Sequence, residues 1–279
     1  MEIDFEEAQK LLPKYEMHRL KELRLISVKS VHLLYEFPFT MPNLEKLELY
    51  SWDLGDGITA NIPRQKRLGM VLQLKELVLL NSNIKDLELG RVLEGVPALR
   101  RLELLSLVTC HRLTKLCPSS VSFTYMTSLK LKNCYTLRNL MASSTAKTMV
   151  QLQTMKVIRC HNLKQIVSNE GSEEGKVMKI VFSKLISVEL VGLEEMTSFC
   201  SNKECEFEFP SLEIVIVREC PKMEKFSERE SIAPKLKNVF GVEGDQKAKW
   251  HWEGHLNATI QKVFNDKVLT HFFIRLLSF

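Results

Sequence analysis

Six apolar positions recur along this chain in the order LxxLxLxxCxxLxxL, and this repeat constrains the fold more than any single residue does. The interval between copies is about 24–33 residues. The clearest copies are Met126–Leu140, Leu152–Ile166 and Leu212–Phe226. A chain with such a period stacks one supersecondary unit on the next. The pattern therefore predicts a solenoid in place of a single globular core.

Nine copies can be placed along the sequence, and their period and consensus are those of a leucine-rich repeat. Each LxxLxL segment predicts a short strand, because leucines two apart point to one face of a strand. We expect an α/β solenoid, a horseshoe with a parallel β-sheet on its concave face and irregular or short helical segments on its convex side. The second position of each copy is held by Leu23, Leu47, Leu77, Leu105, Leu129, Met155, Val188, Val215 and Val239.

The fourth copy can be placed in two registers. A short form uses Leu99, Leu102 and Leu104, directly after Pro97. The longer form fits all six apolar positions, and we prefer it for that reason. Its residues are Leu102, Leu105, Leu107, Cys110, Leu113 and Leu116.

The chain has seven cysteines, whereas a disulfide framework would need pairs. Because free cysteine behaves as a small buried hydrophobe, the recurring cysteines are expected in the core of a protein kept in a reducing compartment, the cytoplasm. Cys200 and Cys205 lie close together, but no second ligand pair follows, so no metal site and no cofactor are predicted. The recurring cysteines are Cys110, Cys134, Cys160 and Cys220.

The expected domain organisation is a lead-in over residues 1–19, repeats over 20–242, and a C-terminal cap and tail over 243–279. The first repeat strand would leave an open sheet edge unless Met1–Tyr15 covers it. The polar stretch Asn169–Lys176 predicts an exposed loop.

Past Gly241 the apolar spacing changes to three and four residues, which predicts a short amphipathic helix. Trp250 and Trp252 are expected to cover the last repeat. The triplet that begins at Asn257 matches a glycosylation acceptor, but we interpret the match as chance. The apolar run Val268–Phe279 is shorter than the ~20 residues of a membrane span.

No enzyme motif is present: the sequence lacks GxxxxGK[ST], GxSxG, HExxH and GxGxxG. We therefore expect a protein that is not an enzyme. The chain carries 39 basic and 34 acidic side chains, which are interspersed. A nucleic-acid-binding protein usually clusters its basic residues on one face, so no nucleic-acid partner is expected.

The outward positions of the predicted strands remain as the candidate binding surface on the concave face. Stacking should bring Lys130, Lys132 and Lys156 together as a small positive patch. Exposed apolar and aromatic side chains near it are typical of protein interfaces, although adjoining polypeptide could equally cover this face. The candidate residues are Arg24, Glu48, Tyr50, Lys130, Lys132, Lys156, Ile158, Glu189 and Arg218.

Three phrases carry a family resemblance: the stretch from LTKLCPSSVSFTYM to CHNLKQIV, FPSLEIVIVRECPKMEKFS, and KWHWEGHLNATIQKVF. They resemble the repeats of plant intracellular nucleotide-binding disease-resistance proteins that have a coiled-coil N-terminus. The resemblance implies immune surveillance: the repeats would sense a pathogen effector or a guarded host protein, and would hold a nucleotide-binding domain inactive.

The sequence departs from that family because it has no phosphate-binding loop and no coiled-coil heptads. It is therefore expected to represent the repeat region alone, unable to exchange or hydrolyse ATP itself. The alternative is a generic intracellular adaptor, such as the substrate-binding module of a ubiquitin ligase. That class needs a docking segment before the repeats, and the 19 residues before Leu20 leave little room.

Overall fold

The structure is a computed structural model, and it describes residues 1–11, 17–29, 41–53, 74–85, 101–117, 121–168, 177–242 and 249–265. The expected loop Asn169–Lys176 and the apolar run Val268–Phe279 lie outside these residues. None of the helices in the described ranges is long and apolar enough to cross a membrane.

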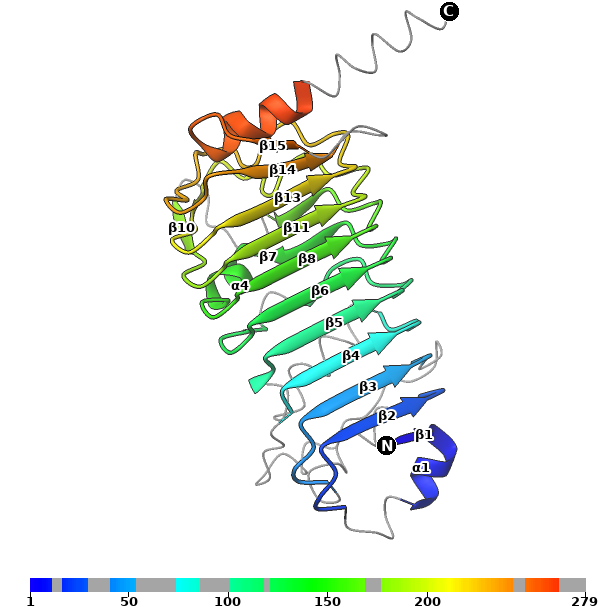
Figure 1. The fold of residues 1–279 in the computed structure, drawn as a ribbon. Coiled ribbons are helices and arrows are strands. Elements are labelled where there is room, and N and C mark those ends of the chain that lie inside the picture. Colours follow the sequence, from blue (N-terminus) through cyan, green and yellow to red (C-terminus); the bar gives the residue numbers. More distant parts are fainter. Residues whose placement is uncertain are drawn as a thin grey trace, which may run out of the picture.

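One long sheet runs the length of the solenoid, with a single strand added per repeat (Figure 1). Neighbouring strands are parallel throughout, except for the last pair. The predicted leucine-rich repeat solenoid is therefore confirmed. In spatial order the strands are β1 (Glu2–Asp4), β2 (Glu22–Ile26), β3 (Lys46–Tyr50), β4 (Glu76–Leu80), β5 (Leu104–Val108), β6 (Ser128–Lys132), β8 (Thr154–Ile158), β11 (Ser187–Val191), β13 (Ile214–Arg218), β14 (Val239–Val242) and β15 (Lys249–His251).

The opposite side of the solenoid is built from short elements. Two small parallel sheets lie there: β7 (Asn139–Ala142) with β9 (Gln165–Ser168), and β10 (Met178–Val181) with β12 (Cys205–Glu208). The helix α4 (Ser143–Thr148) follows β7 directly. These strands were not expected from the sequence, which predicted irregular or short helical segments on this side.

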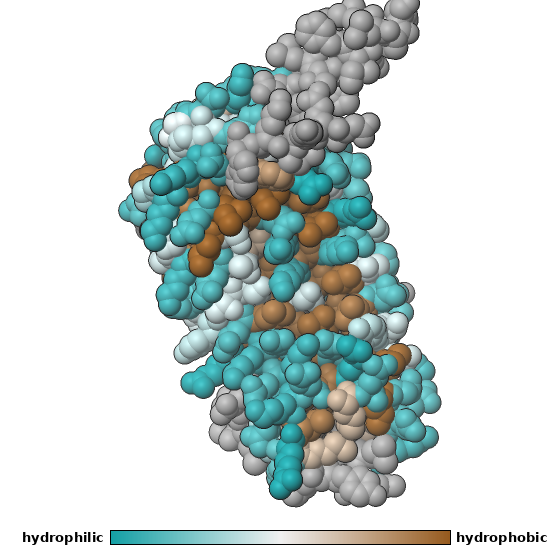
Figure 2. Space-filling view, in the orientation of Figure 1, coloured by the Kyte–Doolittle hydropathy of each residue, from teal (hydrophilic) through white to brown (hydrophobic). Residues whose placement is uncertain are grey.

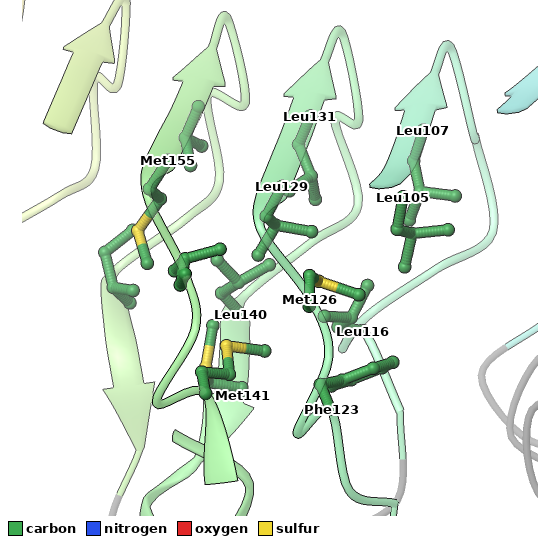
Figure 3. Close-up of a cluster of buried hydrophobic side chains, with 14 of the residues drawn as sticks. Leu105, Leu107, Leu116, Phe123, Met126, Leu129, Leu131, Leu140, Met141 and Met155 are labelled. Atoms are coloured by element: carbon green, nitrogen blue, oxygen red, sulfur yellow. The ribbon is translucent and has the colours of Figure 1, made fainter. Parts of the chain in front are cut away.

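The nine repeat marks form one continuous buried row behind the sheet. In the fourth copy Leu105 pairs with Leu77 on one side and Leu129 on the other, which confirms the longer register. Each mark is at most 1% exposed. Figure 3 shows part of this core, where Leu129 and Leu131 of β6 point toward Leu116 and Met126.

A left-handed residue ends every repeat strand from β2 to β13 and turns the chain toward the core. Its φ lies between 50° and 64° in all eight cases, although only one of the eight is glycine. The next residue is then buried in each repeat. The turn residues are Ser27, Ser51, Asn81, Thr109, Asn133, Arg159, Gly192 and Glu219.

The four recurring cysteines occupy the buried position after this turn, as expected, and the other three cysteines are also buried and free. The recurring thiols also donate to backbone carbonyls of the turn: Cys220 Sγ lies 3.2 Å from the carbonyl oxygen of Arg218. A side-chain hydrogen bond with Cys134, together with burial, raises the pKa of Cys110 and Cys160. Neutral thiols are poor nucleophiles, so Cys110 and Cys160 serve the core.

Both ends of the solenoid are covered by chain outside the repeats. At the start β1 pairs in parallel with β2, and α1 (Phe5–Leu11) buries Ala8. This is the covering role that the open edge requires.

At the other end β15 pairs antiparallel with β14, and a helix over residues 256–265 follows. Leu256 and Ile260 of this helix join the core. The side chain of Trp252, which was expected to cover the last repeat, is 36% exposed, and the helix supplies buried residues at this end. The side chain of Trp250 lies outside what the structure describes.

Candidate binding surface

The open face of the main sheet carries rows of side chains that cross the repeats, and two of these rows contain all nine candidate residues. The strand register places residues of one row directly opposite one another. The first row is Glu2, Arg24, Glu48, Val78, Ser106, Lys130, Lys156, Glu189, Ile216 and Phe240. The second row is Asp4, Ile26, Tyr50, Leu80, Val108, Lys132, Ile158, Val191 and Arg218.

All nine candidate residues lie on this face, but they do not form one patch. Arg24, Glu48 and Tyr50 are on β2 and β3. The other six lie on β6, β8, β11 and β13, beyond the uncharged outward positions of β5. Figure 2 shows the result as hydrophobic side chains along the face that are interrupted by hydrophilic ones.

Four charged residues on the N-terminal strands form a cluster of ion pairs. Arg24 donates to Glu48 at 2.7 Å and to Glu2 at 2.9 Å, and its guanidinium lies 5.3 Å from the centre of the Tyr50 ring. Lys46 also contacts Glu48, at 2.9 Å. Burial raises the pKa of Glu48, but hydrogen bonds from Lys46 and Arg24 outweigh that effect and hold it below 4.5. These ion pairs connect the side chains of β1, β2 and β3.

The positive patch in the middle of the face is smaller than predicted. Lys156 Nζ lies 2.8 Å from Glu189 Oε2, so this charge is neutralised within the sheet. Lys130 and Lys132 are both exposed and have no ion-pair or hydrogen-bond partner among the described residues. The patch therefore consists of these two lysines on β6.

Apolar side chains flank Lys132 and continue toward the C-terminal strands, whereas Lys130 lies between Ser106 and Lys156. Val108 and Ile158 flank Lys132 on the neighbouring strands. Farther along, Ile214 at the start of β13 is 39% exposed. On the same strand, the Nε atom of Arg218 is shielded from solvent and has no hydrogen-bond partner. This part of the face thus offers apolar contact area and unpaired cationic groups together.

Residues 121–242 match the family model of the leucine-rich repeats of RPS2-like plant disease resistance proteins. This stretch is a leucine-rich repeat region of the disease-resistance type, as the resemblance implied. Comparisons with curated proteins and with solved structures found no significant match.

The RPS2-like repeat region runs from just before β6 to the end of β14. It therefore contains the part of the open face where cations are unpaired, and excludes the ion-paired cluster on β2 and β3. Six candidate residues fall inside it: Lys130, Lys132, Lys156, Ile158, Glu189 and Arg218.

A second feature lies at the edge of the sheet, where the strands end, and two of its three residues, Tyr135 and His161, belong to the RPS2-like repeat region. The rings of His111, Tyr135 and His161 stack along neighbouring repeats, with centroids 6.2 Å and 5.3 Å apart. His161 Nδ1 lies 3.0 Å from Glu194 Oε1. Sequence analysis did not predict this stack, although each ring directly follows a repeat cysteine. Within the described residues no cluster of three or more His, Cys, Asp or Glu side chains is arranged to hold a metal ion.

Proposed function

We propose that this chain is the protein-binding repeat module of a plant intracellular immune receptor-like protein, and that it binds its partner on the open face of the sheet. One observation carries the proposal. Within the RPS2-like repeat region, the exposed side chains of Lys130 and Lys132 have no ion-pair partner among the described residues, and partly exposed apolar side chains flank Lys132 on the open face. Such surfaces are typical of interaction sites.

Three classes of partner agree with a repeat region of this type: a pathogen effector, a guarded host protein, or a nucleotide-binding domain. Each would contact apolar side chains for affinity and charged ones for specificity. Because neighbouring repeats present their outward residues in continuous rows, a partner can contact several strands at once.

Site-specific photo-crosslinking in plant cells tests where the partner binds. A benzoylphenylalanine at Ser106, in the first row, should crosslink to discrete proteins. The matched control places the same group at Lys147 of α4, which is exposed and lies among the short elements opposite the main sheet (Figure 1). Equal crosslinking from both positions would contradict binding on the open face. Crosslinks to the core subunits of a ubiquitin ligase would favour the adaptor function.

Restraint of a nucleotide-binding switch is the second part of the proposal, and it requires two coupled sites. Full-length sequencing of the transcript tests it. A message that continues upstream into a frame encoding GxxxxGK[ST] would support restraint within one polypeptide. A message that begins at Met1 would overturn restraint within one polypeptide and leave binding as the function.

A further inference from the structure

The unpaired cations of the open face are concentrated between β6 and β13. Lys130, Lys132 and Arg218 have no ionic partner among the described residues, and the shielded Nε of Arg218 lacks an acceptor. Lys156 and Glu189 lie between them but neutralise each other. Polar groups held out of solvent are nearly always hydrogen-bonded, so an acceptor is missing at Arg218.

Two of these cations share the second row at a defined spacing. Lys132 on β6 and Arg218 on β13 are separated by β8 and β11. Three strand spacings of ~4.8 Å place their backbones ~14 Å apart. The residues between them in this row are apolar, Ile158 and Val191.

An extended polypeptide that crosses the strands matches this spacing. Because such a chain advances ~3.3 Å per residue and alternates its side chains, residues i, i+2 and i+4 face the sheet over ~13 Å. Acidic side chains at i and i+4 would reach Lys132 and Arg218. An apolar side chain at i+2 would lie over Ile158 and Val191.

The charge of the neighbouring strands favours an acidic protein segment over a nucleic acid. Among the described residues of this face only Lys130, Lys132 and Arg218 are free cations, whereas a nucleic acid presents a phosphate at every nucleotide. Acidic side chains also outnumber basic ones on the face of β1 to β4, which would repel a long polyanion. The charged residues there are Glu2, Asp4, Glu22, Arg24, Lys46, Glu48 and Glu76.

We propose that the open face of β6, β8, β11 and β13 binds an extended partner segment with two carboxylates four residues apart and an apolar side chain between them. This inference rests on the proposed function and names the chemistry of the partner. Lys130, two residues from Lys132 on the same strand, adds a second positive charge at one end of the site.

Fluorescence polarisation with defined peptides tests the proposal on the full chain. The probe is a labelled peptide with the core Glu-Ser-Leu-Ser-Glu. Its analogue with glutamine in place of both glutamates should bind on the order of tenfold more weakly, and so should the Glu-Glu-Ser-Leu-Ser isomer. Binding of the probe should also weaken as salt is added. Equal affinity for the probe and the glutamine analogue, or tighter binding of a single-stranded oligonucleotide, would overturn the proposal.

Protein variants locate the site. The pair Lys130→Glu and Lys132→Glu should weaken binding of the probe on the order of tenfold, and Arg218→Gln should weaken it several-fold. The control pair is Lys147→Glu and Lys203→Glu, which makes the same change in net charge at exposed positions off the open face. The proposal is overturned if the control pair weakens binding as much as the first pair does.

Protein binding on the open face and recognition of two carboxylates can be tested separately. If the crosslinks from Ser106 persist in the variant with Lys130→Glu and Lys132→Glu, and the probe does not bind, the open face binds protein but not through carboxylates. If the probe binds as described but Ser106 yields no crosslinks in cells, the acidic specificity stands and the proposed function loses its support.

Discussion

Lys156 and Glu189 form an ion pair across β8 and β11, with Nζ 2.8 Å from Oε2. The strand register places them directly opposite in the first row, where side chains of parallel neighbours meet. Basic residues of the open face therefore fall into two groups: those paired with acidic residues of the sheet, and those left for a partner. Lys156 belongs to the first group, and Lys130 to the second.

The ion pair leads to a prediction on stability. Lys156→Glu would set two carboxylates opposite each other and should lower the free energy of unfolding by ~0.5–1 kcal/mol, a modest loss because both side chains are partly solvated. Lys130→Glu, which breaks no pair, should stay within ~0.5 kcal/mol. Urea denaturation measures both. Combining Lys156→Glu with Glu189→Lys should restore the free energy of unfolding, because the charges are exchanged and attract again. A double variant that is less stable than Lys156→Glu alone would refute the pairing.

A core substitution tests the repeat register. Leu131 is 1% exposed and lies between Leu107 and Val157 in the second buried row. Leu131→Ala should lower the free energy of unfolding by ~2–5 kcal/mol, because it leaves a cavity between repeats. Thermal unfolding followed by circular dichroism gives the measurement. A melting temperature equal to that of the unaltered protein would mean that Leu131 points outward.

The sheet could be predicted from the sequence because the apolar LxxLxL pattern of its strands recurs in every repeat. Leucines two apart in a strand must share a face, so the buried and open rows follow once the second mark of each copy is placed. This fixed the register of the fourth copy, where Leu105 and not Leu102 pairs with Leu129. The sequence pattern grouped Lys156 with Lys130 and Lys132, whereas its ion pair is with Glu189 on the next strand.

The ends and the convex side could not be predicted in the same way. Their contacts depend on which segments meet in three dimensions, as when β7 pairs with β9. The strand β1 is three residues long and acidic, so nothing in its composition marks it as the partner of β2. The repeat pattern also did not show how this end is covered: Leu256 and Ile260 of the helix over 256–265 are buried there, whereas Trp252 is 36% exposed.

The ionic cluster at Glu48 predicts how stability changes with acid. Hydrogen bonds from Lys46 and Arg24 hold its pKa below 4.5 in the folded state, despite the opposing effect of burial. The unfolded chain therefore takes up this proton first, and its stabilising effect is lost as pH falls below 4.5 and through the folded pKa. Glu48→Gln should flatten the decline of melting temperature in this range. Glu213→Gln, at an exposed position, serves as the control and should leave the decline unchanged.

The side-chain amide of Asn257 connects the C-terminal cap to the last repeats. Asn257 Oδ1 accepts hydrogen bonds from the backbone N–H groups of Phe226 and Ser227, both at 3.0 Å, and its Nδ2 donates to the carbonyl of Ser227 at 3.0 Å. The side chain thus joins the helix over 256–265 to the last repeats.

Asn257→Ala should lower the free energy of unfolding by ~1–3 kcal/mol, because it leaves partly buried backbone groups unpaired. Asn257→Asp retains the acceptor and should lose less. Asn162→Ala is the matched control, since that exposed amide donates only to the carbonyl of Tyr135 and should matter less. Urea denaturation and hydrogen exchange at Phe226 and Ser227 provide the readouts. Faster exchange at these two amides in the alanine variant is expected, and unchanged exchange would show that another group holds the cap in place.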